Sequence, residues 1–193
     1  IDGGINLELV KTPPGELRWF KGLGEARKAY EDGKPDEWTM ELLLDSKDPK
    51  TIEWTMLMEN KFEEIHGKDA KKNTWWFNCN PDKEDPSKLC VKFKKRCFVD
   101  NNGTKTQGPN VIDSRLEKWP VSKEIGNGSK GIIAFKIVPW SAGKSGSGMT
   151  LDPMKVMIID YVEYSGGTIP SDDDVFGSVQ GGYSLKEDAE KSF

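Results

Sequence analysis

The chain of 193 residues contains only one histidine, His66, and three cysteines, Cys79, Cys90 and Cys97. The cysteines form no CxxC pair and are remote from the histidine, which argues against a disulfide scaffold and a structural zinc site. A lone histidine with no serine or cysteine motif beside it also gives little support for a nucleophilic catalytic triad. The sequence therefore predicts no metal, no other cofactor and no enzyme activity.

Long apolar runs and phosphate-binding loops are missing as well. No stretch of about 18 apolar residues occurs and no basic-then-apolar leader opens the chain, so we expect neither a membrane span nor a signal peptide. Residues 143–146 resemble the end of a phosphate loop, but a glycine-rich loop follows where that motif needs a helix. At 193 residues the chain is long enough to bury a proper core, and its length predicts one domain, or one domain plus a tail.

The net charge of −4 hides a segregation along the chain. Residues 86–144 hold 10 Lys and 2 Arg against 2 Asp and 2 Glu, a net charge of +8. Residues 145–193 hold 3 Lys against 6 Asp and 3 Glu, a net charge of −6. A basic middle with acidic flanks favours a polyanion site and an acidic element that competes for it. The alternative is that the basic strands only form a solvated face.

Alternating apolar residues predict about six short strands with one helix inserted early. The expected strands are residues 17–23, 38–44, 89–99, 111–114, a strand that ends at Trp140, and 151–164. This pattern predicts an all-β fold with one capping helix, as a small, mostly antiparallel barrel or sandwich.

The predicted helix has signals at both ends. Asp48 can cap its first turn, Pro49 suits the first helical position, and Gly67 ends it. Apolar residues at helical spacing follow the cap, and we interpret them as core. They are Trp54, Leu57, Met58, Phe62 and Ile65.

The strand that ends at Trp140 follows a glycine-rich turn. Ile133, Phe135 and Ile137 point to one face, and Lys130, Lys136, Val138 and Trp140 point to the other. Because Pro139 has no N–H to donate, we expect regular pairing to end there, at an edge or a strand end. Trp140 is either a core residue or part of an exposed basic and aromatic face, and this stretch alone leaves both readings open.

The strand at residues 89–99 is the most basic one. Lys92, Lys94 and Arg96 share one face, and the other face is apolar, with Leu89, Val91, Phe93 and Cys97. Single-stranded nucleic acid binds to basic grooves with aromatic faces, because cations contact its phosphates and bases stack on the rings. The three cations of this strand, together with Lys130, Lys136 and Trp140, fit that description.

Three segments resemble the single-stranded DNA-binding proteins of short-tailed bacteriophages. They are residues 38–58 with DSKDPK at the helix start, residues 91–96 with VKFKKR, and residues 111–140 with VIDSRLEKWPVSKEIGNGSKGIIAFKIVPW. The agreement runs in order through most of residues 17–164, and the order and spacing of the segments carry it.

The resemblance implies an OB-fold over residues 1–165, a five-stranded antiparallel barrel with a capping helix. It implies sequence-nonspecific binding of single-stranded DNA in phage replication, recombination and repair, a homodimer, and the cytoplasm of an infected bacterial host. Trp140 falls where the family has a stacking aromatic, and Lys94 matches a DNA-contacting lysine. Arg96 stands where the family often has an aromatic, and a guanidinium plane can also stack. The predicted DNA-binding residues are Lys92, Lys94, Arg96, Lys130, Lys136, Trp140 and Lys144.

Residues 166–193 are expected to form a flexible acidic tail, because they lack the apolar density to fold alone. In the family this tail ends in an aromatic, contacts the replicative DNA polymerase and occupies the DNA groove in its absence, which implies replisome proteins as partners. The tail here has a net charge of −4, whereas family tails are usually longer and more acidic. The predicted partner-binding residues are Asp172, Asp173, Asp174, Glu187, Asp188, Glu190 and Phe193.

Two other functions remain open at this point. A non-catalytic protein- or carbohydrate-interaction module would use exposed tryptophans, namely Trp19, Trp75 and Trp76, and its binding would survive high salt. An enzyme that acts on nucleic acid has little support, because the dense carboxylate run at residues 172–174 reads as a solvated motif rather than a metal site.

Overall fold

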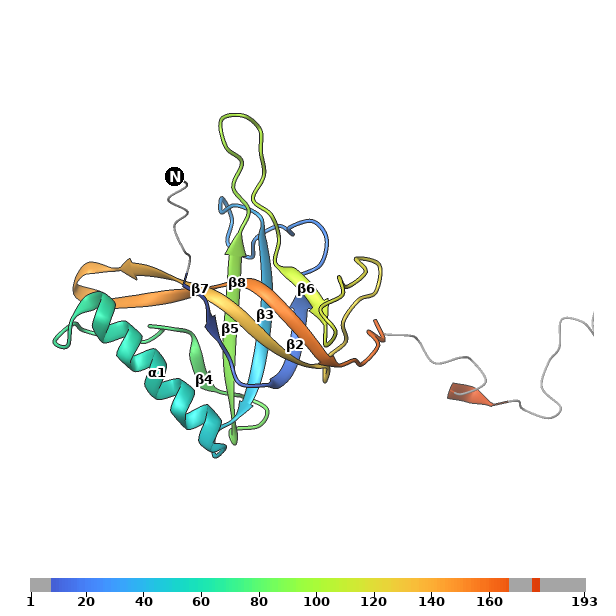
Figure 1. The fold of residues 1–193 in the computed structure, drawn as a ribbon, viewed down its shortest axis with the longest axis horizontal. Helices are drawn as coiled ribbons and strands as arrows, with labels where there is room; N and C mark the ends of the chain where they lie inside the picture. Colours follow the sequence, from blue (N-terminus) through green and yellow to red (C-terminus); the bar gives the residue numbers. More distant parts are fainter. Residues whose placement is uncertain (1–7, 167–174, 178–193) are drawn as a thin grey trace, which may run out of the picture.

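The computed structural model describes residues 8–166 and 175–177, and the first of these ranges holds one sheet (Figure 1). Five long strands form its body: β2 (Gly15–Lys21), β3 (Glu37–Asp45), β5 (Lys88–Arg96), β7 (Lys130–Ser141) and β8 (Ser147–Asp160). Three short strands extend it: β1 (Val10–Lys11), β4 (Cys79–Pro81) and β6 (Asn110–Asp113). The strand order is β4-β5-β3-β2-β7-β8-β6, and β1 pairs with β7.

The five long strands pair antiparallel and confirm the predicted OB-fold barrel with a helical cap. β6 is parallel to β8, and the sequence pattern did not indicate whether this pair is parallel or antiparallel. Within the described residues no ladder joins β5 to β8, so the barrel is open at that seam. β1 and β4 were not predicted, because strands of two and three residues are too short to show an alternating pattern.

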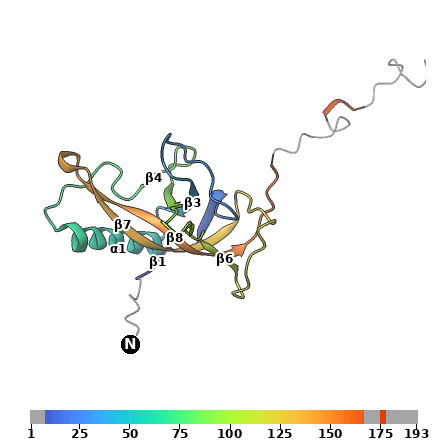
Figure 2. The same cartoon turned by 90° about the horizontal axis from the view of Figure 1, so that it is seen from above.

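The helix α1 (Pro49–His66) packs beside the barrel, and its C-terminal end comes near the extended end of β7 and β8 (Figures 1 and 2). The Asp48 side chain accepts a hydrogen bond from the Lys50 N–H, and Gly67 ends the helix at a φ of 94°, as predicted. Thr51, Trp54, Met58 and Phe62 are its buried residues. The prediction that Leu57 and Ile65 belong to the core was wrong, because both are 40% exposed. Positions 54, 58 and 62 are four residues apart and follow one narrow line on the helix, and the other two lie beside that line.

The core fills the inside of the barrel and extends to the buried face of α1. Ile133 and Phe135 on β7 are fully buried, as predicted, and Ile137 packs against the same cluster. The rings of Trp54 on α1 and Phe135 meet edge to face with their centroids 6.3 Å apart. The apolar face of β7 therefore joins the helix to the barrel and leaves its other face available for a site.

β2 departs from regular alternation at Trp19. The residue has a φ of 50°, in the left-handed region, and the β2–β3 register shifts between Arg18 and Lys21. Phe20 packs against the core, while Trp19 is 56% exposed. A bulge of this kind turns one side chain away from the face that simple alternation gives it.

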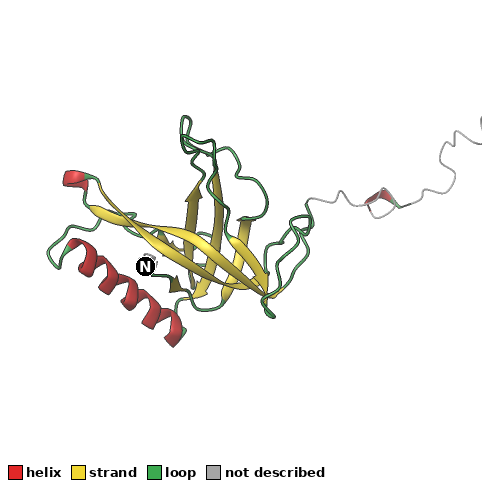
Figure 3. Cartoon of the chain, turned by 45° about the horizontal axis from the view of Figure 1, so that its top comes forward, coloured by secondary structure: helices red, strands yellow, loops and turns green. Residues whose placement is uncertain are grey.

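The prediction that pairing ends at Pro139 was wrong. Pro139 stands opposite Met149, and the β7–β8 ladder continues to Ser141 and Ser147. β8 is the only described strand beside β7 at this point, so the proline faces an unpaired edge, where its missing N–H costs no ladder bond. The two strands thus form a long hairpin that projects from the barrel, with a 3-10 turn at Gly143–Ser145 at its tip (Figure 3).

Candidate nucleic-acid interface

The predicted basic face of β5 is present. Lys92, Lys94 and Arg96 alternate with buried Val91 and Phe93, so the three cations point outward from the barrel. What the sequence left open was which charges stand beside them, because that depends on the register of β5 against β3.

The register sets the three cations into rows that cross β2, β3 and β5. Residues directly opposite one another on adjacent strands share a face of the sheet. The rows are Arg18–Glu41–Lys92, Lys21–Thr39–Lys94 and Arg27–Glu37–Arg96, with Arg27 joined to Glu37 by an isolated bridge just after β2. We call these nine residues the basic rows. They hold six cations and two carboxylates, so their net charge is +4.

The two glutamates in the basic rows orient the neighbouring cations but do not accept hydrogen bonds from all of their N–H groups. Glu37 Oε2 lies 3.8 Å from Lys94 Nζ and 3.6 Å from Arg96 Nη1, and Glu41 Oε1 lies 3.8 Å from Lys92 Nζ. These distances are beyond ordinary hydrogen bonds, so the cationic N–H groups remain able to donate to a phosphate. Arg96 Nη1 is buried and has no hydrogen-bond partner in the described part of the chain.

The guanidinium of Arg18 is occupied by hydrogen bonds within the protein. Its Nε donates to Glu41 Oε2 at 2.9 Å and its Nη2 donates to Asp82 Oδ1 at 2.7 Å. The bond from Arg18 lowers the pKa of Asp82 to about 2. Arg18 therefore fixes the segment after β4 to the sheet, and five cations of the rows remain available to a ligand: Lys21, Arg27, Lys92, Lys94 and Arg96.

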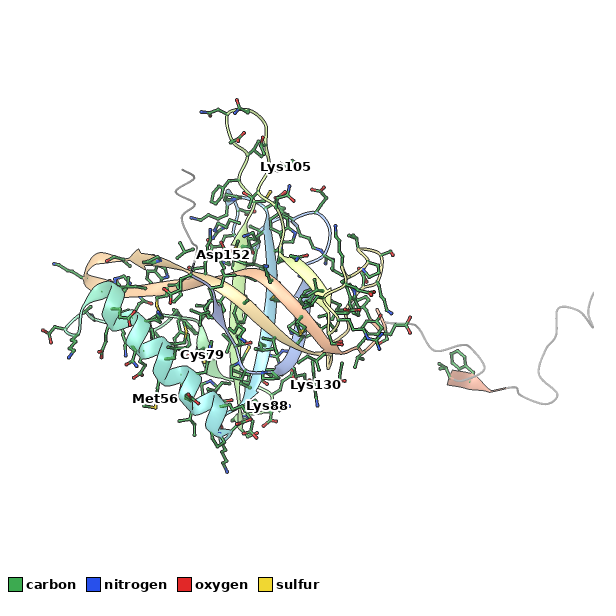
Figure 4. All side chains as sticks on the ribbon, viewed as in Figure 1. Met56, Cys79, Lys88, Lys105, Lys130 and Asp152 are labelled. Carbon is green, nitrogen blue, oxygen red and sulfur yellow. The ribbon has the colours of Figure 1, made fainter. Side chains whose placement is uncertain are left out.

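A second charged cluster lies where β8 crosses β5, at the position of Asp152 (Figure 4). Lys95 is only 5% exposed and its Nζ donates to Asp152 Oδ1 at 3.0 Å. Lys136 Nζ lies 3.5 Å from Asp152 Oδ2, so one carboxylate holds cations from two strands. The predicted residue Lys136 is thus placed beside β5.

Sequence reasoning missed Lys95, although a signal was present. Adjacent residues of a strand point to opposite faces, so the run Lys94-Lys95-Arg96 must turn one cation inward. It also missed Lys21 and Arg27, which reach the site only through the pairing of β2 and its following loop with β3. A polar segment between strands gives no indication of that register.

Trp140 and Lys144 lie on the projecting hairpin. The Trp140 ring is half-buried against Gly148, where an added Cβ would meet the indole, so Trp140 is neither a core residue nor a free one. His66 Nε2 is hydrogen-bonded to the Gly148 carbonyl oxygen at 3.0 Å, and Lys71 Nζ donates to the Lys144 carbonyl oxygen at 3.0 Å. These bonds fix the hairpin on the end of α1 and leave the Lys144 side chain exposed.

Lys130 is not brought together with the other predicted residues. It begins β7, opposite Glu16 on β2 and Asp160 on β8, and lies near the end of the barrel remote from the hairpin tip (Figure 4). Ten residues of strand separate it from Trp140, which corresponds to about 33 Å. Its predicted contact with DNA stays a prediction, as do those of the other site residues.

The tryptophans proposed for an interaction module differ in exposure. Trp19 is 56% exposed and Trp75 is 59% exposed, as that hypothesis requires. Trp76 instead packs against the core, with its ring centroid 5.3 Å from that of Phe62 and Lys72 Nζ 4.6 Å above it. The expectation that Trp76 is exposed was wrong, because its ring covers the end of α1.

The three cysteines are free thiols. Burial raises the pKa of Cys79 to about 12 and that of Cys90 to about 11, so both remain protonated at neutral pH. Within residues 8–166 and 175–177, no group of three His, Cys, Asp or Glu side chains is arranged to hold a metal ion. No helix within the same residues has the length and apolarity that a bilayer crossing requires.

The predicted tail residues, Asp172, Asp173, Asp174, Glu187, Asp188, Glu190 and Phe193, lie outside the described residues. Their partner-binding role and the domain boundary after residue 165 stay predictions.

No protein-family model and no curated protein matches the sequence. The fold, however, is similar to solved structures. The gp2.5 single-stranded DNA-binding protein encoded by bacteriophage T7 is 20% identical, covers 92% of this chain and 98% of its own, and superposes with a TM-score of 0.62. The single-stranded DNA-binding protein from bacteriophage Enc34, in complex with single-stranded DNA, is 12% identical, with coverages of 82% and 89% and a TM-score of 0.62. At the level of the fold, these similarities confirm the resemblance that the sequence indicates.

Proposed function

We propose that this chain binds single-stranded DNA without marked sequence preference. The observation that carries the proposal is the set of basic rows, which places five available cations on one face of an OB-fold barrel. Proteins that bind single strands by charge and stacking need such a face, and they need no base-specific hydrogen bonds. The similar folds of two phage single-stranded DNA-binding proteins support the same conclusion.

Phosphates bind to the cations of the basic rows and release the counterions that surround the free DNA strand. Lys94 and Arg96 stand at the centre of this contact, each close to Glu37, which restricts the cation geometry before DNA arrives. Bases stack on the exposed part of the Trp140 ring, and Lys136 and Lys144 lie on the same hairpin to contact the adjoining phosphates. Lys130 contacts the strand further along β7.

Competition with unlabelled DNA tests this proposal. A fluorescent oligo-dT of about 16 nucleotides is bound, and unlabelled single strands of mixed sequence and a duplex of equal length are then added as competitors. We expect the single strands to compete equally well whatever their sequence and the duplex to compete poorly, because paired bases cannot stack on a protein ring. Equal competition by the duplex, or no binding of oligo-dT at low salt, contradicts the proposal.

The biological setting is proposed from the family resemblance and the similar phage folds. The chain then acts in phage DNA replication, recombination and repair, as a homodimer, in the cytoplasm of an infected bacterium. The acidic tail contacts the phage DNA polymerase and other replisome proteins. We propose no catalytic role.

The tail proposal has its own experiment. Removal of residues 166–193 deletes a net charge of −4, which is expected to tighten DNA binding at low salt if the acids compete with phosphate. Unchanged affinity at low salt removes the competition from the proposal and leaves DNA binding by the barrel intact.

The exposure of Trp19 and Trp75 supports one alternative, a protein- or carbohydrate-interaction module. Binding through apolar rings persists at high salt, whereas binding through phosphates weakens steeply. Binding of a protein or glycan that persists at high salt, together with no binding of oligo-dT, favours the alternative.

A further inference from the structure

A hollow of about 110 Å³ lies beside the basic rows, around the bulge in β2. Trp19 and Tyr164 are its exposed aromatic lining residues, 56% and 55% exposed, and Phe20, which packs against the core, also lines it. Lys21 and Arg27 also line it. The hollow therefore combines flat aromatic surfaces with two cations.

The exposure of Trp19 is imposed by the backbone. Its φ of 50° is unfavourable for a residue with a side chain, and the adjacent register shift turns it out of the β2 alternation. The Trp19 N–H donates to Asn127 Oδ1 at 2.9 Å, so a side chain from the turn before β7 holds this conformation. A strained, exposed tryptophan that the fold holds in place is a feature typical of ligand sites.

The hollow is continuous with the basic rows. Lys21 is the first residue of the row that ends at Lys94, and Arg27 is the first residue of the row that ends at Arg96. Two strand spacings separate the ends of each row, which is about 10 Å. Among the described residues, Glu124 is the one carboxylate that lines the hollow, and its Oε1 lies 4.0 Å from Arg27 Nη2. This separation is too long for a hydrogen bond, so Arg27 and Lys21 both remain able to contact a phosphate.

We propose that this hollow receives a base of the single strand that crosses the basic rows. The base stacks on Trp19 with Tyr164 at its other side, and the adjoining phosphates contact Lys21 and Arg27. This inference rests on the proposed function and extends it, because it adds a second stacking position near the end of β7 remote from Trp140. Ile125 is the aliphatic residue in the lining, and because it is buried it offers little surface to a ligand. The hollow therefore suits a flat aromatic ring better than an apolar peptide side chain.

The test separates base stacking from phosphate contact. Affinities of the full chain are measured for oligo-dT of about 16 nucleotides and for an abasic strand of equal length, which keeps the sugar-phosphate chain but has no bases. Trp19→Ala is expected to weaken oligo-dT binding about 5- to 150-fold and to leave abasic binding unchanged. Lys21→Ala is expected to weaken both, and Trp19→Phe is expected to retain most of the affinity for oligo-dT.

Tyr30→Ala is the matched control, because Tyr30 is a fully exposed aromatic that does not line the hollow. It is expected to bind both strands as the wild type does. Unchanged oligo-dT affinity in Trp19→Ala overturns the inference while the proposed function stands, and the hollow then serves another ligand. Equal losses on the two strands also overturn it, since they show a general disturbance of the surface. Failure of the wild type to bind oligo-dT contradicts the proposed function itself.

Discussion

Lys95 on β5 and Asp152 on β8 are joined by a buried hydrogen bond of 3.0 Å across the seam where the barrel has no ladder. The pair replaces main-chain pairing at this point. Asp152→Ala leaves the Lys95 ammonium buried without its partner, and we expect a loss of roughly 3–5 kcal/mol in the free energy of unfolding. Urea unfolding measures it.

The double variant Lys95→Met/Asp152→Leu should recover most of that loss, because apolar residues of similar size avoid the cost of burying charge. Asp160→Ala serves as the control, since Asp160 is exposed on the same strand and its loss should stay within about 0.5 kcal/mol. If Asp152→Ala unfolds at the same urea concentration as the wild type, the pair does not hold the seam.

The ion pair between Arg18 and Asp82 contributes to the free energy of unfolding, and this contribution changes at acid pH. The bond from Arg18 lowers the pKa of Asp82 from 3.8 to about 2 in the folded protein. A carboxyl with a lowered pKa stabilises the fold fully above its unfolded pKa, and this stabilisation disappears as the pH falls through the folded pKa. The stability difference between wild type and Asp82→Asn should therefore shrink between pH 3.8 and about 2.

Thermal unfolding at a series of pH values measures this effect. Arg18→Met removes the cause of the shift and should reproduce the loss of pH dependence seen in Asp82→Asn. A constant difference between wild type and Asp82→Asn across this pH range would show that the carboxyl titrates equally in the folded and unfolded states.

Glu37 opposes DNA while it orients Lys94 and Arg96. Glu37→Gln keeps the size of the side chain and removes one negative charge from the centre of the basic rows. A unit charge at 4 Å is worth about 1 kcal/mol in water and more at a buried carboxylate such as Glu37, so we expect DNA affinity to rise by about fivefold or more. Fluorescence titration with oligo-dT measures the change.

Glu59→Gln is the control for the loss of one negative charge. Glu59 lies on α1 and pairs with Lys72, outside the basic rows. The affinity of this variant should equal that of the wild type. A weaker affinity for Glu37→Gln, at an unchanged melting temperature, would mean that orientation of the cations outweighs the charge that opposes phosphate.

The fold was predictable where local patterns decide it. The caps of α1 at Asp48 and Gly67, the buried face of β7 and the outward face of β5 all follow from residue type and period. The error at Leu57 and Ile65 arose because helical spacing allows a wider stripe than the sheet covers. Trp19 departed from alternation because Asn127, 108 positions away, holds a left-handed backbone that no local pattern indicates.

The candidate site was only half predictable, for a similar reason. Lys92, Lys94 and Arg96 stand on one strand, so period two alone brings them together. Lys21 and Arg27 join them through the register between strands, which a single sequence does not reveal. Lys130 was grouped with Trp140 because both share a face of β7, but sharing a face does not place residues near each other along a twelve-residue strand.

Trp140 is expected to contribute to binding without holding the fold. Its ring is half-buried against Gly148 on the projecting hairpin, away from the fully buried residues of the barrel. Trp140→Ala should weaken oligo-dT binding by roughly 1–3 kcal/mol through the loss of one stacked base. Circular dichroism and the melting temperature should stay close to those of the wild type. An unfolded Trp140→Ala variant would make Trp140 a core residue.

The salt dependence of oligo-dT binding reports how many phosphates the protein neutralises, and so tests DNA binding by the basic rows. Each phosphate neutralised on a single strand contributes about −0.7 to the slope of log K against log salt. The five available cations of the basic rows therefore predict a slope of about −3.5, and contacts from Lys130, Lys136 and Lys144 steepen it to about −5.6. Lys94→Ala should reduce its magnitude by about 0.7, and Lys50→Ala, an exposed lysine on α1, should leave it unchanged. A binding constant that is measured by tryptophan fluorescence quenching and falls with this slope supports DNA binding through the basic rows. Quenching that does not change with salt, or no quenching at low salt, would contradict it.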